Sequence, residues 1–580
     1  MITVLFASVG LLVLFVLCPL IWLCRLVPTY DPVDRAVLAP VVAILLFAVS
    51  TGIGQFVPWS FELHALTTSL VLVASLAFIA LPRVRDELAR SVRLGWGILV
   101  PAACCFLAVA AFGVVQGDPP RTVSYPGTLV SARVTNLPPD HLFAVGAAQI
   151  LQHRTDPMTR DFFEFWDFAD RTPLAGAVTA TSALAIGGDL PERAIWRLPG
   201  AALAPVVPDD LGYWQAHLVL VLLNTLVVIA VARFARSIFG ARAGIIAGFL
   251  AALNPFVFTN AFFTWPKMLA AYFVLLHYTY LRERRGALLC GGTAGLAYLS
   301  HPLALVFLVP SLVVSLGRLR APRLNVLGAF VLTILPWQVW SALWAHPSRM
   351  LTYPLGYTIR NPDRLGDEVD KAFRLFREAG LGHAISVRWD SIVATVWPFD
   401  PARNFVTLPD VHLSSAEAWF TVHDRTIGGM VLFALIPALV IGFVVWHRRA
   451  TYEWVWALVA PLVLAVGFWG IEPQGLGAAL LQPTAAVLVA LAAGGLVTGP
   501  YALSVVVGLV GILEAASVVW LGLFARSASA TGLDVAIAVA IWSVPAIALA
   551  IVLLSAPRSR ARETRARPRA TFRPAREPAR

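Results

Sequence analysis

The residues best suited to chemistry in this sequence are a few charged side chains at the edges of apolar segments. Asp140 and His141 open a segment whose apolar residues recur at helical spacing. Further acidic residues follow in the next thirty positions, at Asp156, Asp161, Glu164, Asp167 and Asp170. A carboxylate here can act as a general base if an acceptor hydroxyl lies within about 2.6–3.2 Å. A carboxylate at a helix start is also a common cap, and spacing alone favours that role for Asp140.

Lys267 is a second candidate because lysine is rare in this chain. Only two of its 44 lysine and arginine residues are lysines, and this one stands in Thr264-Trp265-Pro266-Lys267-Met268 at the end of an apolar run. Such a lysine can extend to the lipid headgroups, or it can hold a phosphate at the membrane surface with a compact positive charge. His301, which precedes Pro302 between two apolar runs, is a weaker candidate, since a single interfacial histidine is more often structural.

The elements that must position these residues are membrane-spanning helices. Of the 580 residues, 58% are hydrophobic and only 13% are charged, and the mean hydropathy is +0.76. Soluble globular proteins carry about 25% charged residues, and a single soluble core rarely exceeds roughly 300 residues. Apolar runs of about 20 residues have the length needed to cross a bilayer. The composition therefore predicts an all-α polytopic membrane protein.

The net charge of +11 does not indicate a nucleic-acid partner. Residues 557–580 hold nine arginines and two glutamates, so this tail alone carries +7 of the total. Its content of arginine, proline and alanine, without apolar periodicity, is typical of a disordered segment. We expect the tail to lie on anionic membrane lipids.

Cysteine placement and the N-terminus add two further expectations. All five cysteines lie inside apolar runs, so the sequence predicts neither a disulfide framework nor a zinc site. The first 23 residues lack basic residues before the apolar stretch and a small-residue cleavage site after it, which predicts a retained helix. No cofactor is predicted, and a requirement for a divalent metal ion stays open.

The placement of arginines predicts the topology. About fifteen apolar runs are present, near residues 2–24, 36–57, 63–82, 94–115, 215–232, 243–260, 264–281, 287–300, 302–317, 324–345, 427–446, 452–470, 476–497, 501–524 and 533–555. Arginines cluster at alternate connections, and connections rich in lysine or arginine face the cytoplasm. With the N-terminus outside and the C-terminus inside, every cluster falls on the cytoplasmic side.

This topology divides the chain into six parts. They are extra N-terminal transmembrane helices (1–115), an outer segment with interfacial helices (116–214), a transmembrane core (215–345), a second outer segment (346–426), C-terminal transmembrane helices (427–556) and the basic cytoplasmic tail (557–580). In the first outer segment we expect an interfacial helix over 140–153, with Phe143, Ala147, Ile150 and Leu151 on one face. The run 173–186 is too short to span and is predicted to be interfacial or re-entrant. In the second segment, residues 369–376 predict an amphipathic helix.

Six short motifs follow one another between residues 138 and 316. They are Pro139-Asp140-His141, Asp170-Arg171-Thr172-Pro173-Leu174, and the segments 235–242, 252–256, 264–267 and 295–302. Their order and sidedness resemble those of GT-C superfamily glycosyltransferases of the protein O-mannosyltransferase and aminoarabinose-transferase type. The C-terminal third resembles these enzymes only in its hydropathy, and the four N-terminal helices are extra.

The resemblance implies a cell-membrane enzyme that transfers a hexose or pentose from a polyprenyl-phosphate donor to a glycan, lipid or protein acceptor on the outer face. Asp140 matches the family's catalytic aspartate, with His141 beside it. Many relatives have two consecutive acids there, and an acid near the position of Lys267. The second polar group is therefore a carboxylate from 156–170, His141, or none. Lys267 and Arg171 are the candidates for the donor phosphate, and Asp170 and His301 are further candidates for the substrate site.

Three other interpretations of the sequence stay open. An outer-face ligase or polymerase of lipid-linked glycans would use the second outer segment, where Arg360, His383 and Arg388 are candidates. A transporter would show internal repeats and polar residues near the bilayer midplane, whereas here the polar residues lie at the outer boundary. A non-catalytic assembly subunit would need no site.

Overall fold

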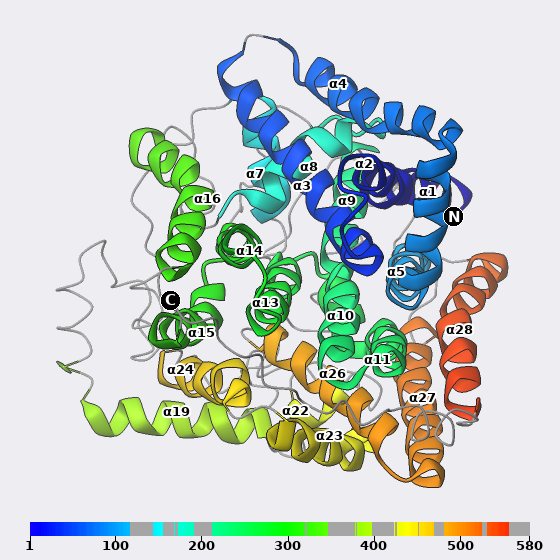
Figure 1. Cartoon of the computed structure of the whole chain (residues 1–580), viewed down its shortest axis with the longest axis vertical. Helices are drawn as coiled ribbons and strands as arrows, with labels where there is room; N and C mark the ends of the chain where they lie inside the picture. Colours follow the sequence, from blue (N-terminus) through cyan, green and yellow to red (C-terminus); the bar gives the residue numbers. More distant parts are fainter. Residues whose placement is uncertain are drawn as a thin grey trace, which may run out of the picture.

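The computed structural model describes residues 1–57, 59–116, 143–154, 168, 172–190, 211–318, 322–345, 377–378, 380–396, 423, 426–449, 452–468, 481–524 and 531–555. Within these ranges the protein is entirely helical and contains no strand (Figure 1).

The N-terminal part contains α1 (Ile2–Leu12), α2 (Cys18–Leu26), α3 (Pro32–Phe56), α4 (Phe61–Val73), α5 (Pro82–Gln116), α7 (Phe143–Gln152) and α8 (Leu174–Leu184). The middle contains α9 (Leu211–Thr225), α10 (Val227–Phe239), α11 (Ala241–Leu253), α12 (Pro255–Phe262), α13 (Lys267–Arg282), α14 (Ala287–Ser300), α15 (Ala304–Arg318) and α16 (Pro322–Trp344). The C-terminal part contains α19 (Leu381–Val396), α22 (Ile427–Val431), α23 (Ile436–Arg449), α24 (Ala460–Phe468), α26 (Gln482–Thr498), α27 (Tyr501–Phe524) and α28 (Gly532–Leu554).

Each of the fifteen predicted apolar runs contains a helix, but the helices differ in length. Among the described residues, eight helical segments are long and apolar enough to cross a membrane, or nine if the bent pair α11 and α12 is one span. Other apolar helices are shorter, such as α14 with 14 residues. The chain is therefore a helical membrane protein, and the predicted number of fifteen spans is not confirmed.

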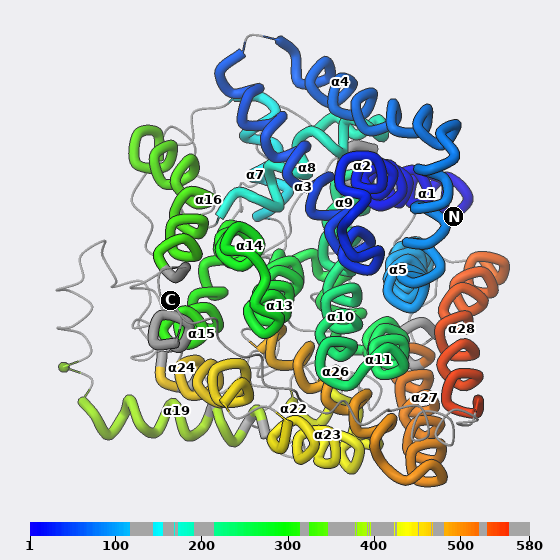
Figure 2. The backbone as a smooth tube through the Cα atoms, viewed as in Figure 1, coloured from blue at the N-terminus to red at the C-terminus, as the bar shows by residue number. Residues whose placement is uncertain are grey.

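The centre of the bundle is formed by α10 and α26, which contact each other, and by α11 and α13, each of which contacts both of them (Figures 1 and 2). Every described residue of α13 from Lys267 to Tyr280 is buried. Small residues bring helix backbones together at this centre: a Cβ atom added to Gly495 of α26 would lie 1.7 Å from the carbonyl oxygen of Ala438 in α23. Such close approach is typical of helix pairs in membranes.

The peripheral helices expose apolar side chains in the manner expected of a lipid-facing surface. In α16, Leu324, Leu332 and Leu343 are 74%, 70% and 63% exposed. Contiguous exposed apolar surface of this kind is rare in soluble monomers. The exposed face of α16 therefore agrees with the assignment as a membrane protein.

Helices α7 and α8 belong to the predicted first outer segment. The helix predicted from residue 140 is present over Phe143–Gln152, but all ten of its residues are buried, so its expected one-sided interfacial packing is wrong. The physical reason is that α8, α9 and α3 cover it. A Cβ atom on Gly176 of α8 would lie only 2.6 Å from that of Ala147.

Arg154 fastens the end of α7 to the end of α3. Its backbone has a φ of 48°, and its guanidinium donates to the carbonyl oxygens of Gly54 (2.8 Å), Val57 (2.7 Å) and Trp59 (2.5 Å). These bonds satisfy carbonyl groups at and beyond the end of α3. The α7–α8 pair is thereby held at the end of α3 that is remote from Asp34.

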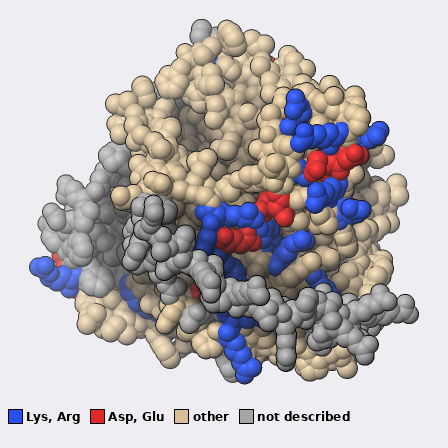
Figure 3. Space-filling model, viewed as in Figure 1, with Lys and Arg blue, Asp and Glu red and all other residues tan. Residues whose placement is uncertain are grey.

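Five of the predicted basic connections lie together at the opposite end of the bundle. Five contacts establish this: Arg35 with Glu87, Arg236 with the Leu94 carbonyl oxygen, Arg242 with the Ser555 carbonyl oxygen, Arg282 with Glu453, and Arg449 with the Ile238 carbonyl oxygen. In Figure 3 most of the charged side chains on this face lie between its upper right and its centre, with a few near the left and lower edges. For these five connections the arginine pattern correctly predicted a shared end, while the side of the membrane that this end faces stays a prediction.

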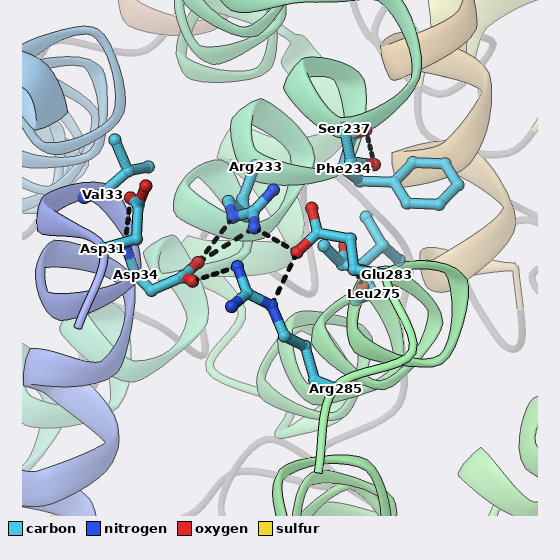
Figure 4. Close-up of polar contacts among 10 residues, drawn as sticks. Asp31, Val33, Asp34, Arg233, Phe234, Ser237, Leu275, Glu283 and Arg285 are labelled. Carbon is cyan, nitrogen blue, oxygen red and sulfur yellow. Dashed lines mark hydrogen bonds and ion pairs between the residues drawn. The ribbon is translucent and has the colours of Figure 1, made fainter. Parts of the chain in front are cut away.

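A partly buried ion-pair cluster lies at the centre of this arginine end (Figure 4). Arg233 of α10 donates from Nε and Nη2 to Asp34 Oδ1, at 3.1 and 2.9 Å, and from Nη2 to Glu283 Oε2 at 2.7 Å. Arg285 donates to Asp34 Oδ2 at 2.6 Å and to Glu283 Oε2 at 3.1 Å. The charges of two acidic residues and two arginines therefore balance one another. Their contacts link α3, α10 and the α13–α14 connection.

Removing one charge from this cluster should destabilise the fold. Asp34 is 2% exposed, so Asp34→Asn leaves Arg233 in a buried site with excess positive charge. We expect a loss of about 3–5 kcal/mol in the free energy of unfolding, measured as a lower thermal midpoint of the purified protein in detergent. The matched control is Asp86→Asn, because Asp86 is exposed. Equal midpoints for wild type and Asp34→Asn would show that the cluster contributes little.

The predicted sidedness can be tested by cysteine labelling in intact cells. Ser131→Cys and Ser414→Cys should react with a membrane-impermeant maleimide from outside, whereas Ser559→Cys should react only after permeabilisation. Background should be low because the native cysteines are buried or half-buried. The reverse pattern of labelling would invert the topology and remove the outer-face chemistry.

Candidate functional site

Lys267 begins α13, at the end of that helix remote from the arginine cluster. Fifteen residues separate it from Arg282, roughly 22 Å along a helix. Its side chain is not stretched over the surface: Lys267 is 4% exposed, and its ammonium lies 3.0 Å from the centroid of the Trp265 ring. A cation held against an indole face is stabilised by the ring quadrupole.

A break in the preceding span positions Lys267. Helices α11 and α12 meet at an angle of 57°, where Pro255 cannot continue the α11 hydrogen-bond pattern. Asn254 caps α12 by accepting from the N–H groups of Phe256 (2.9 Å) and Val257 (3.3 Å), and its Nδ2 donates to the Met430 carbonyl oxygen at 2.6 Å. After α12, the turn through Thr264 leads directly into α13.

His301 is brought to the same place from the end of α14. It is 2% exposed, its Nδ1 accepts from the N–H of Leu303 at 3.2 Å, and its ring meets the Trp265 ring edge-on at 6.2 Å between centroids. The next helix, α15, begins at Ala304. Trp265 therefore contacts both Lys267 and His301.

A small pocket joins these residues to the start of α26. It is lined by Lys267, Ala270, His301, Leu303, Ala304, Phe307, Gln482 and Pro483. Gln482 Nε2 donates to Asn260 Oδ1 at 3.2 Å, and Asn260 Nδ2 donates to the Phe256 carbonyl oxygen at 3.0 Å. This chain of amides ties the start of α26 to α12.

The electrostatics of this pocket favour an anion. The N-terminal ends of α13, α15 and α26 all line it, and each helix N-terminus carries partial positive charge. Neither Pro266 nor Leu481, the N-cap residues of α13 and α26, provides a capping side chain. Asn224 Oδ1 accepts from the N–H of Leu269 at 3.2 Å, so one group of the first turn of α13 is already satisfied.

The structure thus brings together two of the residues singled out from the sequence, Lys267 and His301. Four others, Asp140, His141, Asp170 and Arg171, lie outside the described residues, as do the acidic residues at 156, 161, 164 and 167 and the helix predicted over 369–376. Among the described residues, no group of three or more histidine, cysteine or acidic side chains could hold a metal ion. The sequence analysis did not select Gln482 or Asn260 as site residues. Gln482 lies within an apolar run, and its contact with Asn260 exists only in the folded chain.

The candidates in the second outer segment differ from Lys267 in their surroundings. Arg360 lies outside the described residues, and His383 is exposed on α19. Arg388 donates to the Gly467 carbonyl oxygen at 3.0 and 2.9 Å and to the Ala384 carbonyl oxygen at 2.8 Å. Burial lowers the pKa of the Arg388 guanidinium from its ordinary value. These bonds fasten α19 to the end of α24, which is a structural role.

Glu514 is a buried carboxylate in α27 that the sequence analysis did not single out. Its Oε1 accepts from His423 Nε2 at 2.8 Å and from the N–H of Phe433 at 2.9 Å, and its Oε2 accepts from the N–H of Ala434 at 2.9 Å. The two N–H groups follow Leu432, whose φ is 74°, just before α23. Glu514 therefore caps the start of a helix segment across the bundle.

The fold and this site define a multi-pass helical membrane protein with a buried, positively polarised pocket at the end opposite its arginine cluster. Comparison with known proteins adds one distant likeness. No family model and no curated protein matches the chain. The chain is similar to a solved structure of the archaeal oligosaccharyltransferase AglB from Archaeoglobus fulgidus in complex with an inhibitory peptide and a dolichol-phosphate, at 14% identity and a TM-score of 0.35. The match covers 80% of this chain and 56% of that one.

Proposed function

We propose that this protein is a GT-C-type glycosyltransferase that moves a sugar from a polyprenyl-phosphate donor to an acceptor on the outer face of the membrane. The observation that carries the proposal is the pocket at Lys267, where a buried ammonium and three helix N-termini converge. The charge of this arrangement suits an anion such as a phosphate, and the pocket, about 10 Å³ in volume, has room for one of its oxygens. The order of motifs between residues 138 and 316 supports the class of enzyme.

Burial of Lys267 favours phosphate binding over simple anchoring at the headgroups. An anchoring lysine keeps its ammonium in the headgroup region, whereas Lys267 is 4% exposed and folded over Trp265. In a site of low dielectric, the attraction between ammonium and phosphate is much stronger than at the surface. Lys267, with Arg171 as a second cation, would stabilise the phosphate that leaves with the lipid.

Asp140 is the proposed general base. It would take the proton of the acceptor hydroxyl as the acceptor oxygen bonds to the anomeric carbon of the sugar. The bond from that carbon to the phosphate oxygen breaks, and the electron pair leaves with the polyprenyl phosphate. His141 and Asp170 are candidates for orienting the reacting groups, and His301 borders the phosphate pocket.

Replacing the base should abolish transfer without unfolding the protein. Asp140→Asn retains a capping oxygen and nearly the same shape but removes the basicity, so we expect transfer to fall at least about 100-fold with little change in protein abundance. The assay uses membranes and a panel of radiolabelled polyprenyl-phosphate hexoses and pentoses. Asp189→Asn is the control, since Asp189 is an exposed carboxylate in the same outer segment. Near-normal transfer by Asp140→Asn would leave Asp140 only a capping role.

Substitutions of Lys267 separate phosphate binding from membrane anchoring. Anchoring predicts a nearly silent Lys267→Arg, whereas phosphate coordination in a tight pocket predicts sensitivity, because the guanidinium is larger and forked. Lys267→Met should weaken donor binding while the protein still inserts. The measurement is the affinity of purified wild type and both variants for undecaprenyl monophosphate in detergent. Lys371→Met, which removes the other lysine, is the control, and equal affinities throughout would exclude a phosphate role for Lys267.

A further inference from the structure

Trp265 contacts both Lys267 and His301, the two described residues that the sequence analysis assigned to this site. The Lys267 ammonium lies over the face of this ring, 3.0 Å from its centroid. The rings of His301 and Phe263 form edge-to-face pairs with it, at 6.2 and 5.6 Å between centroids. Because the ammonium lies over the ring, the position of Trp265 fixes the position of the charge.

The backbone around Trp265 is held in an uncommon conformation. Thr264 has a φ of 55°, in the left-handed region that residues other than glycine seldom adopt. Pro266 follows, and a proline restricts the residue before it to extended conformations. Strain of this kind persists where the surrounding structure enforces it, and it is concentrated at ligand sites.

The indole N–H of Trp265 is buried without an acceptor. Trp265 is 7% exposed, and within the described residues its Nε1 atom makes no hydrogen bond. Buried donors are nearly always paired in native proteins, so an orphaned one calls for an explanation. An indole nitrogen only donates, and the partner it lacks is therefore an acceptor oxygen.

We propose that Trp265, which contacts Lys267 and His301 of the pocket lining, is a specificity-determining residue for the phosphate. Its ring face orients the Lys267 ammonium, and its N–H donates to an oxygen of a polyprenyl phosphate. This inference rests on the proposed function and adds a second donor to it. An acceptor oxygen in the plane of the Trp265 ring, about 2.9 Å from Nε1, lies roughly 5–6 Å from the Lys267 ammonium. One phosphate can span this distance, because one of its oxygens accepts from the indole N–H and a second accepts from the ammonium.

The proposal predicts opposite effects of Trp265→Phe on the free and the bound protein. Phenylalanine keeps an aromatic face for Lys267 but removes the N–H. Without ligand, the thermal midpoint in detergent should stay unchanged or rise, because a buried donor without an acceptor is unfavourable. Affinity for undecaprenyl monophosphate should fall about tenfold, the usual effect of losing a hydrogen bond to a charged acceptor. A purely structural tryptophan would lower the midpoint and leave the affinity unchanged.

Trp446→Phe is the matched control. Trp446 of α23 is fully buried, its Nε1 also lacks a hydrogen-bond partner within the described residues, and it packs against Phe234. It directly precedes His447, Arg448 and Arg449 and so lies at the arginine end, remote from the pocket. The same loss of an N–H there should leave affinity for the phosphate unchanged.

A double-mutant cycle with Lys267→Met completes the test. Trp265→Leu removes both the ring face and the N–H. We expect this change to lower the affinity about 100-fold in the wild-type background but much less in the Lys267→Met background, because the two residues act on one ligand.

Undecaprenol, which lacks the phosphate, should bind equally to all variants. Failure of wild type to prefer the phosphate over the alcohol would overturn the proposed function. A preference that Trp265→Phe and Trp265→Leu both retain would overturn the role of Trp265 alone.

Discussion

The arrangement of this bundle depends on the pairing of buried charges at one end. Asp34, Arg233, Glu283 and Arg285 come from three separate parts of the chain, and the two buried members, Asp34 and Arg233, would be costly to leave unpaired. Their mutual contacts fix the ends of α3 and α10 and the connection after α13 relative to one another. Since a helix is stiff, fixing one end of α13 also determines where its other end lies, and that end carries Lys267. The ion pairs at the arginine end therefore position the pocket at the opposite end without touching it.

The sequence predicted the class of fold well, because hydrophobicity and arginine placement are local signals. Every apolar run contains a helix, and five contacts bring five of the seven arginine clusters together as the alternating pattern indicated. The number of spans was harder to predict, since α14 and similar short helices are covered by their neighbours and need not match the thickness of a bilayer. The packing of α7 was predicted wrongly for the same reason. Ala147, which the sequence placed on the apolar face of an interfacial helix, instead packs closely against Gly176 of α8.

The site was only partly predictable. Lys267 stood out by its rarity and His301 by its place between two runs, and the structure brings both to one pocket. Gln482 gave no signal, because its partner Asn260 lies more than two hundred residues earlier and their contact exists only in the folded chain. Trp265 was visible as the neighbour of Lys267, yet its orphaned N–H depends on burial that no spacing reveals. The role of Asp140 stays a prediction from the motif that contains it.

The polar side chains near the pocket form two groups, according to whether they hydrogen-bond to the protein's own backbone and side chains. Irregular backbone at membrane depth is tolerated only where protein covers it and its polar groups are paired. Asn254 caps the break between α11 and α12, and Asn260 supports α12 while receiving Gln482. Asn224 likewise accepts an N–H of the first turn of α13. These amides maintain the broken span, so their loss would disturb the backbone and would not report on ligand binding. Trp265 differs from these amides because its N–H satisfies no group of the described backbone, so its removal can distinguish recognition of a ligand from support of the fold.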